Sequence, residues 1–209
     1  MLGPPASGKG TQAEMITARY QFPSASPGSM LREEKKAGSA LGIEADLLTR
    51  EGQLVPDGTI NQLVERWLGK EGEDFVFDGY PRSVGQAEAL QSMLAVRGIP
   101  LEGVLSLEAD LPTLQRRVRN RVVCADCGRN YSVGLTVADE AKPCLACGGS
   151  LARRADDTDE TLARRMEEYA AKTAPLGSYY AKRGLLHAVD ATRGPEQVFA
   201  SIVEILEGA

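Results

Sequence analysis

The clearest chemical signature is a glycine-rich segment at residues 3–11, with the sequence GPPASGKGT. Glycines let a backbone curl until successive N–H groups point at one anion, and a helix that begins there adds its positive end. The segment predicts a phosphate-binding loop, with Lys9 at the β- and γ-phosphates and Thr11 near a metal ion. A strict loop of this kind has Ser or Thr directly after the lysine, where this chain has Gly10, so a plain glycine-rich turn is the alternative.

Only Met1 and Leu2 precede this loop, whereas a buried strand of roughly five residues usually leads into one. The sequence therefore predicts either an unusually short first strand or a start that lies further upstream.

Composition narrows the class of protein. The chain has 209 residues, of which 43% are hydrophobic and 25% charged, enough for one substantial core with one or two small inserts. The net charge of −5 argues against a general nucleic-acid binder, which usually carries a basic excess. There is no apolar run of membrane-spanning length and no secretory signal pattern, so we expect a cytoplasmic protein.

The four cysteines form two matched pairs, Cys124 with Cys127 and Cys144 with Cys147, separated by sixteen residues. Such pairs let four thiolates surround one tetrahedral ion, and four thiolates leave no open position for catalysis. The spacing predicts a structural zinc site, with a redox pair or free buried thiols as the alternatives. Residues 124–150 have few apolar side chains, so we expect metal binding to contribute to their folding.

Charged side chains on several other segments are expected to lie near the predicted loop. Arg117 and Arg121 lie four apart in a helix expected over 111–123, which would place both on one face and favour an anion beside them. Guanidinium groups complement the charge that phosphoryl transfer spreads over several oxygens. Asp78 follows an apolar strand, where a carboxylate can hold Mg²⁺ through water. The other arginines on flanking segments are Arg32, Arg82, Arg154 and Arg165.

The elements that must position these residues alternate between strand and helix, which predicts a doubly wound α/β sheet. Strands are expected at 24–26, 75–77, 104–107 and 185–189. Helices are expected at 12–20, 59–68, 86–97, 111–123, 159–169, 179–183 and 195–206. Residues 26–55 are predicted to form a small helical insert, with helices at 31–36 and 41–51 and Ser29 as the N-cap of the first.

These motifs resemble those of the long-form adenylate kinases with a zinc-binding lid, over nearly the whole chain. The most specific are residues 78–82, DGYPR, together with Gln86 and the four cysteines. Residues 26–32, the pair Leu54-Val55 with Asp57, and residues 154–157 add to the resemblance. It implies a P-loop kinase core with a parallel sheet flanked by helices (1–25, 56–119 and 158–209). It also implies an NMP-binding insert (26–55) and a zinc-binding lid (120–157).

The resemblance implies reversible, Mg²⁺-dependent transfer of the γ-phosphoryl group of ATP to AMP, giving two ADP. A kinase for UMP or CMP is the nearest alternative. A zinc-ribbon regulatory or nucleic-acid-binding protein that uses ATP as a switch is a third. The implied partners are ATP, AMP and ADP, without nucleic acid or membrane, and a monomer is expected.

The resemblance also implies a role for individual residues. The implied ATP-binding residues are Ala6, Ser7, Gly8, Lys9, Gly10, Thr11, Arg117, Arg121, Asn130, Tyr131 and Arg193. The implied AMP-binding residues are Pro27, Arg32, Gln53, Leu54, Val55, Gly79, Tyr80, Pro81, Arg82, Gln86, Arg154 and Arg165. The implied catalytic residues are Lys9, Arg82, Arg121, Arg154 and Arg165, with Thr11 and Asp78 near Mg²⁺ and Cys124, Cys127, Cys144 and Cys147 binding zinc.

Several positions depart from the family pattern. Pro27 stands where a threonine is usual and Ser29 where an aspartate is usual, while Ser132 replaces a common lid histidine. Pro27 bears most on the AMP site, because proline lacks a hydroxyl and a backbone N–H. Ala6 replaces a loop glycine and must either avoid a positive φ or accept strain.

Overall fold

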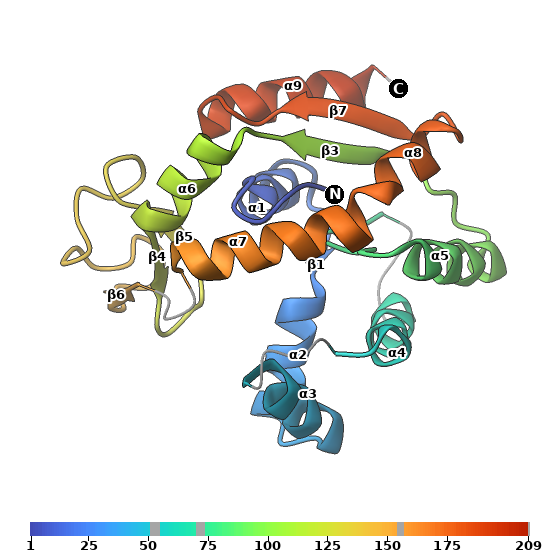
Figure 1. The fold of residues 1–209 in the computed structure, drawn as a ribbon, viewed down its shortest axis with the longest axis horizontal. Coiled ribbons are helices and arrows are strands. Elements are labelled where there is room, and N and C mark those ends of the chain that lie inside the picture. Colours follow the sequence, from blue (N-terminus) through green and yellow to red (C-terminus); the bar gives the residue numbers. More distant parts are fainter. Residues whose placement is uncertain (51–54, 70–73, 154–156, 209) are drawn as a thin grey trace.

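The computed structural model describes residues 1–50, 55–69, 74–153 and 157–208 and contains a parallel sheet with helices on both faces (Figure 1). Strand β1 (Ser24–Ala25) pairs with β2 (Val76–Phe77), and β3 (Val104–Glu108) pairs with β7 (Leu186–Asp190), both in parallel. The α/β fold class predicted from the sequence is confirmed. Among the described residues, no helix has the length and apolar character needed to cross a membrane.

Residues 1 and 2 connect the two strand pairs. The N–H of Leu2 donates to the carbonyl of Leu105 at 2.8 Å, and its carbonyl accepts from the N–H of Leu107 at 2.9 Å. On the other side, the ammonium of Met1 donates to the carbonyl of Phe77 at 2.6 Å. These two residues therefore act as a very short central strand between β2 and β3.

The strands bury side chains on both faces of the sheet. Leu105 and Leu107 pack toward α1 (Lys9–Tyr20) and α9 (Pro195–Glu207). The neighbouring residue Val104 packs with Leu176 and Ala87, which lie on α8 (Pro175–Ala181) and α5 (Val84–Arg97). Because successive side chains of a strand point to opposite faces, burial on both sides explains why these strands are continuously apolar.

Two helices, α2 (Pro27–Lys36) and α3 (Ala40–Arg50), follow β1 and project away from the sheet before α4 (Asp57–Leu68) returns to it (Figure 1). The predicted N-cap, Ser29, is wrong. The N-cap of α2 is Ser26, whose hydroxyl accepts the N–H of Ser29, while the Ser29 hydroxyl accepts the N–H of Ser26, both at 3.1 Å. Pro27 is the first helical residue, where a missing N–H costs nothing.

The helix predicted over 111–123 is also wrong at its end. Helix α6 stops at Asn120, and Arg121–Cys124 form β4, the middle strand of a three-stranded antiparallel sheet. Its partners are β5 (Asn130–Ser132) and β6 (Leu151–Ala152). Val122 is completely buried, and paired β-branched residues favour a strand over a helix.

A long helical arm leads from this antiparallel sheet back to the core (Figure 1). It consists of α7 (Asp159–Glu168), a π-helical turn η1 (Tyr169–Thr173) and α8. Thr158 is the N-cap of α7, and its hydroxyl accepts the N–H of Thr161 at 3.1 Å. The helix expected at 179–183 therefore begins earlier, at Pro175.

We predict that Gly42→Ala destabilises the protein by about 1–3 kcal/mol, because extra atoms in a packed contact force the backbone to move. A Cβ on Gly42 would lie 2.3 Å from the backbone nitrogen of Lys35, so α2 and α3 would have to separate. Urea unfolding measures the change. Gly177→Ala in α8 is the control, because nothing lies within 4 Å of its added Cβ, and it should gain about 0.5–1 kcal/mol. A Gly42→Ala protein as stable as the unsubstituted one would contradict the close approach of the two helices.

Candidate functional site

The loop between residue 2 and α1 wraps around the ammonium group of Lys9. Nζ donates to the carbonyls of Gly3 at 2.8 Å and Pro4 at 2.9 Å, and lies 3.4 Å from the hydroxyl of Ser7. Ala6 has a φ of 63°, so it accepts the strain that a glycine would avoid. The loop is thus curled around a cation at the start of a helix, and both the cation and the positive end of the helix favour an anion there.

Asp78 explains why glycine follows Lys9. A Cβ on Gly10 would lie 3.3 Å from Oδ2 of Asp78, so a side chain there would press on the carboxylate. The hydroxyl residue stands one position later, at Thr11, which is exposed. A hydroxyl and a carboxylate beside the loop offer the oxygen ligands that Mg²⁺ prefers.

Three arginines from separate segments lie near Lys9. Burial lowers the pKa of Lys9 from 10.5 to about 8, while Asp78 acts to raise it. The positive charges of Arg82, Arg165 and Arg121 act to lower the same pKa. Such crowding of cations is what a site for several phosphate oxygens requires.

The backbone of Arg82 is held from both sides. Its N–H donates to Oε1 of Gln86 at 2.7 Å, and its carbonyl accepts the hydroxyl of Thr173 at 2.9 Å. Its own Nε donates to the carbonyl of Gly79 at 2.9 Å. Thr173 belongs to η1, directly after the helix that carries Arg165. Thr173 is not among the residues predicted from the sequence, because no local motif points to a contact between residues so far apart in the chain.

Arg117 connects the loop to the segment after β7. Its guanidinium donates to the carbonyls of Ser7 at 3.0 Å, Ala191 at 2.6 Å and Arg193 at 3.2 Å. Arg193 pairs with Asp190 at 3.0 Å. The structure therefore brings Arg117 and the Arg193 backbone together beside the phosphate loop.

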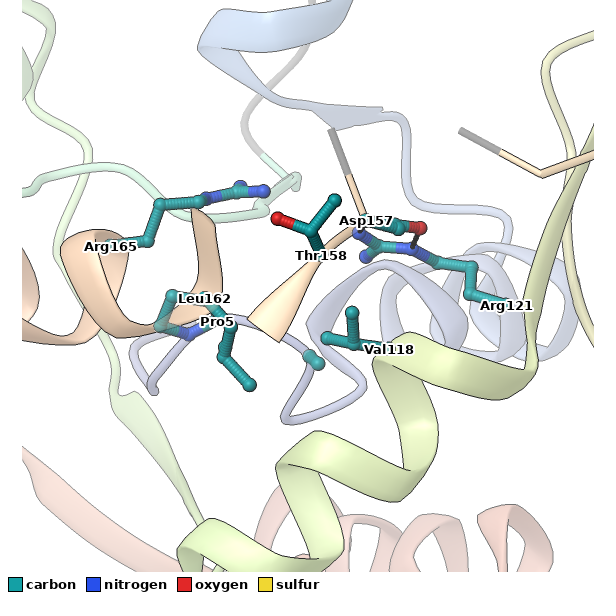
Figure 2. Close-up of a pocket in the computed structure, with 8 residues that line it drawn as sticks. Pro5, Val118, Arg121, Asp157, Thr158, Leu162 and Arg165 are labelled. Atoms are coloured by element: carbon teal, nitrogen blue, oxygen red, sulfur yellow. Dashed lines mark hydrogen bonds and ion pairs between the residues drawn. The ribbon is translucent and has the colours of Figure 1, made fainter. Parts of the chain in front are cut away.

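Figure 2 shows a small pocket between the loop, α6 and α7, where the side chains of Arg121 and Arg165 approach from opposite sides. Arg121 makes a two-pronged ion pair with Asp157, with Nε 2.6 Å from Oδ2. Asp157 is almost entirely buried, with 4% of its side chain exposed. Because α6 ends at Asn120 and Arg121 begins β4, Arg117 and Arg121 do not share a helix face, and that prediction is wrong.

Several of the residues expected to bind AMP lie on two neighbouring segments, while Gln86 is on α5 and Arg165 on α7. Pro27 and Arg32 are on α2, which follows β1, and residues 79–82 follow β2, the partner of β1. The ends of adjacent parallel strands meet at one edge of a sheet, where ligands gather. Tyr80 is buried, and its hydroxyl donates to Asn61 at 2.8 Å. Val55 packs partly buried near α4, whereas Gln53, Leu54 and Arg154 lie outside the described residues.

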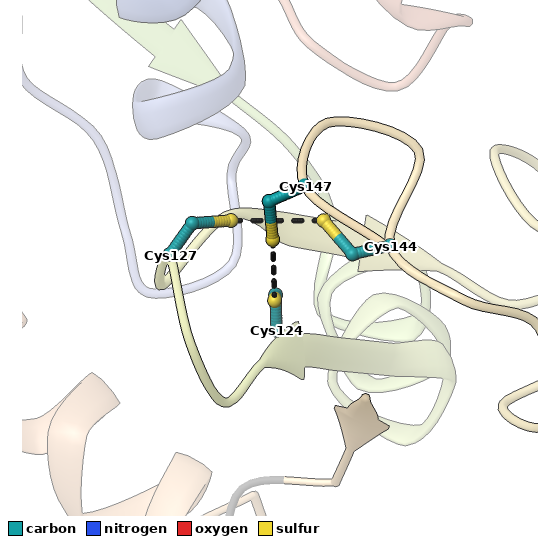
Figure 3. Close-up of side chains that lie close together, drawn as sticks. All are labelled: Cys124, Cys127, Cys144 and Cys147. Atoms are coloured by element: carbon teal, nitrogen blue, oxygen red, sulfur yellow. Dashed lines mark hydrogen bonds between the residues drawn. The ribbon is translucent and has the colours of Figure 1, made fainter. Parts of the chain in front are cut away.

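The four cysteines converge in the antiparallel sheet and its loops (Figure 3). Their sulfurs all lie within 4.8 Å of one another, with Cys124 and Cys147 3.5 Å apart and Cys127 and Cys144 3.6 Å apart. Metal–sulfur bonds of about 2.3 Å in a tetrahedron place sulfurs about 3.8 Å apart, so the cluster fits a bound ion. A hydrogen bond from Tyr131 lowers the pKa of Cys144 to about 6, whereas hydrogen bonds with the other three cysteines raise the pKa of Cys147 to about 12, so the fit to a metal rests on the sulfur positions.

The two lid residues implied to bind ATP differ in their surroundings. The Tyr131 hydroxyl lies 3.2 Å from Sγ of Cys144, inside the small core of this sheet, so it faces the cysteines. Asn130 is exposed on β5. Their contact with ATP stays a prediction.

Comparison with known proteins decides the family. The family model described as "Adenylate kinase" matches residues 1–185. The chain belongs to the adenylate kinase family. It is 42% identical to the adenylate kinase of Carboxydothermus hydrogenoformans, over 99% of this chain and 98% of that protein. It is also 42% identical to the Moorella thermoacetica adenylate kinase, over 97% and 94% of the two chains, and 38% identical to one from Geobacillus, over 100% and 97%. Membership in the adenylate kinase family confirms the predicted resemblance and makes the chain a nucleoside monophosphate kinase. Nothing in the comparisons favours a kinase for UMP or CMP, or a zinc-ribbon protein with a regulatory or nucleic-acid-binding role.

We predict that Lys9 makes the nucleotide-free protein less stable at neutral pH than at alkaline pH. Its pKa in the folded chain is about 8, below the ordinary 10.5, so between these values the unfolded chain binds more protons and stability rises with pH. The stability advantage of Lys9→Met over the unsubstituted protein should therefore shrink, by on the order of 1–3 kcal/mol, from about pH 7.5 to 10. Urea unfolding at several pH values measures it. A difference that does not change with pH would show that Lys9 is fully hydrated.

Proposed function

We propose that this protein transfers the γ-phosphoryl group of ATP reversibly to AMP, giving two ADP. The observation that carries the proposal is the group of four cations, Lys9 with Arg82, Arg121 and Arg165, around one anion-binding loop. The relatives named adenylate kinase support AMP as the acceptor.

The donor nucleotide would lie along the loop and the segment after β7. Backbone N–H groups of residues 6–11 and the ammonium of Lys9 would hold the phosphates. Lys9 now donates to loop carbonyls, and it would gain stronger, charge-assisted partners in the phosphate oxygens. Arg117 and Arg193 would border the adenosine end, because Arg117 already joins the loop to residues 191–193.

The acceptor nucleotide would lie at the ends of β1 and β2. Arg32 and Arg82 would bind its phosphate, and Val55 and Gln86 would border its base. Arg121 and Arg165 would lie between the two nucleotides and stabilise the transferred group. No strong base is needed, because phosphoryl transfer depends on in-line positioning and on charge stabilisation.

The proposed organisation has three parts: a core, an AMP-binding insert at 26–55 and a lid at 120–157. Closure of the lid over the phosphates, a behaviour known for adenylate kinases as a class, would exclude water and direct the phosphoryl group to AMP. Mg²⁺ bound with ATP would neutralise phosphate charge, and Thr11 and Asp78 are the residues that would hold it, directly or through water. We also propose a structural zinc ion at the four cysteines and a monomeric, cytoplasmic enzyme.

The decisive test measures ADP formation from ATP with AMP, UMP or CMP as acceptor. We predict turnover with AMP, and a Lys9→Met variant that loses about 10²–10³-fold in kcat, the usual cost of removing a charge-stabilising donor. Lys182→Met, which removes an exposed lysine, is the control and should keep its activity. Turnover with UMP but not AMP would favour the alternative acceptor, and near-normal activity of Lys9→Met would contradict the loop assignment.

We predict about one zinc ion per chain in purified protein, since four thiolates complete one tetrahedral site. Cys124→Ser should lose the metal and lower the melting temperature by about 4 °C or more, because metal binding contributes to folding of a segment with a small core. Leu145 is exposed and lies between Cys144 and Cys147, so the control variant Leu145→Ala should keep both the metal and the melting temperature. Metal analysis and thermal unfolding check both, and an equally stable, metal-free protein would refute the site.

A further inference from the structure

Asp57 is the first residue of α4, and both of its carboxylate oxygens bind the start of α5. Oδ2 accepts the Ser83 hydroxyl and Oδ1 accepts Nε2 of Gln86, each at 2.6 Å. The Ser83 oxygen in turn accepts the backbone N–H of Gln86 at 3.1 Å and caps α5. Asp57 is therefore hydrogen-bonded to the side chain of Gln86, the amide that the proposed function places beside the base of the acceptor nucleotide.

The other end of the Gln86 amide is held as well. Oε1 accepts the backbone N–H of Arg82 at 2.7 Å, and Gln86 is only 4% exposed. A carboxylate can only accept and a backbone N–H can only donate, so one of the two orientations of the amide satisfies both partners. Turning the amide over would place two acceptors together at Asp57 and two donors together at Arg82, so both of these partly buried hydrogen bonds of the buried Gln86 side chain would be lost.

A fixed amide leaves a fixed pattern for a ligand. A primary amide has two N–H donors and two carbonyl lone pairs, so one donor and one acceptor position of Gln86 remain. The remaining carbonyl lone pair can accept from an amino group, and the remaining N–H can donate to an unprotonated ring nitrogen beside it. Adenine presents these two groups side by side. A 6-oxo purine has a carbonyl beside a ring N–H. Its carbonyl would meet the Gln86 carbonyl, and its ring N–H would meet the Gln86 N–H, so neither hydrogen bond would form.

We propose that Asp57 determines specificity, by fixing the orientation of the Gln86 amide so that the site selects 6-amino over 6-oxo purine monophosphates. Asp57 is a positioning residue, because it acts on the base only through Gln86. The inference rests on the proposed function, in which Gln86 borders the base of the acceptor. It assigns to Asp57 a role in substrate choice in addition to its contribution to packing between α4 and α5.

The test compares AMP with IMP, which differ only at the 6-substituent and the protonation of the neighbouring ring nitrogen. Asp57→Asn has nearly the same shape, but its amide can offer either N–H or C=O to Gln86. The ratio of kcat/KM for AMP to that for IMP should fall by about tenfold or more, the scale of discrimination lost when a polar match is released. The change should lie in KM for the monophosphate, with KM for ATP unaltered.

Glu196→Gln is the matched control, because it removes an exposed first-turn carboxylate from another helix, α9, and should keep the ratio. If Asp57→Asn lowers the melting temperature but keeps the ratio, the inference is wrong and the proposed function stands. Equal use of AMP and IMP by the unsubstituted enzyme would also overturn the inference. A lack of any transfer to AMP would instead overturn the proposed function.

A second measurement uses the unsubstituted enzyme and so does not depend on the variant folding. In ¹⁵N NMR spectra, one of the two side-chain N–H protons of Gln86 should exchange slowly with solvent, because it is bonded to Asp57 and the Gln86 side chain itself is buried. Rapid exchange of both protons would show that the amide is not held, and would overturn the inference.

Discussion

Mutual repulsion of the positive charges around Lys9 is the constraint on which the rest of the structure depends. Cations interact strongly where water is scarce, so each must be anchored by the protein before an anion arrives. Arg117 is anchored by three backbone carbonyls, Arg121 by the carboxylate of Asp157, and Arg82 by the carbonyl of Gly79. Because these partners belong to the folded chain, the three charges are held in place before any anion binds.

The sheet brings these anchors together. Residues 1 and 2 lie between β2 and β3, so the loop that follows them begins beside Asp78 and the end of β3. Parallel strands end at one edge, which gathers the loop, residues 78–82 and the start of α2 there. These two residues bond to neighbours on both sides, and Met1 and Leu2 pack into opposite faces of the sheet.

The two segments outside the sheet are stabilised by different means. Helices α2 and α3 approach so closely that Gly42 has no room for a side chain, and a reciprocal Ser26–Ser29 cap begins the first of them. The antiparallel sheet of the lid has a core of few residues, two of them cysteines. Close backbone packing joins the two helices, whereas the small antiparallel sheet gathers four thiolates whose spacing fits a metal ion.

The sequence alone determined the features that depend on neighbouring residues: the phosphate loop, the cysteine pairs, the apolar strands and the α/β alternation. It did not determine where α6 ends, because Arg121–Cys124 become a strand only through partners at 130–132 and 151–152. It also did not reveal that Thr173 holds Arg82, that Arg117 binds the carbonyls of residues 191 and 193, or that Asp57 orients Gln86. Those hydrogen bonds join residues far apart in the chain, so only the packing of helices around the sheet sets their direction and length.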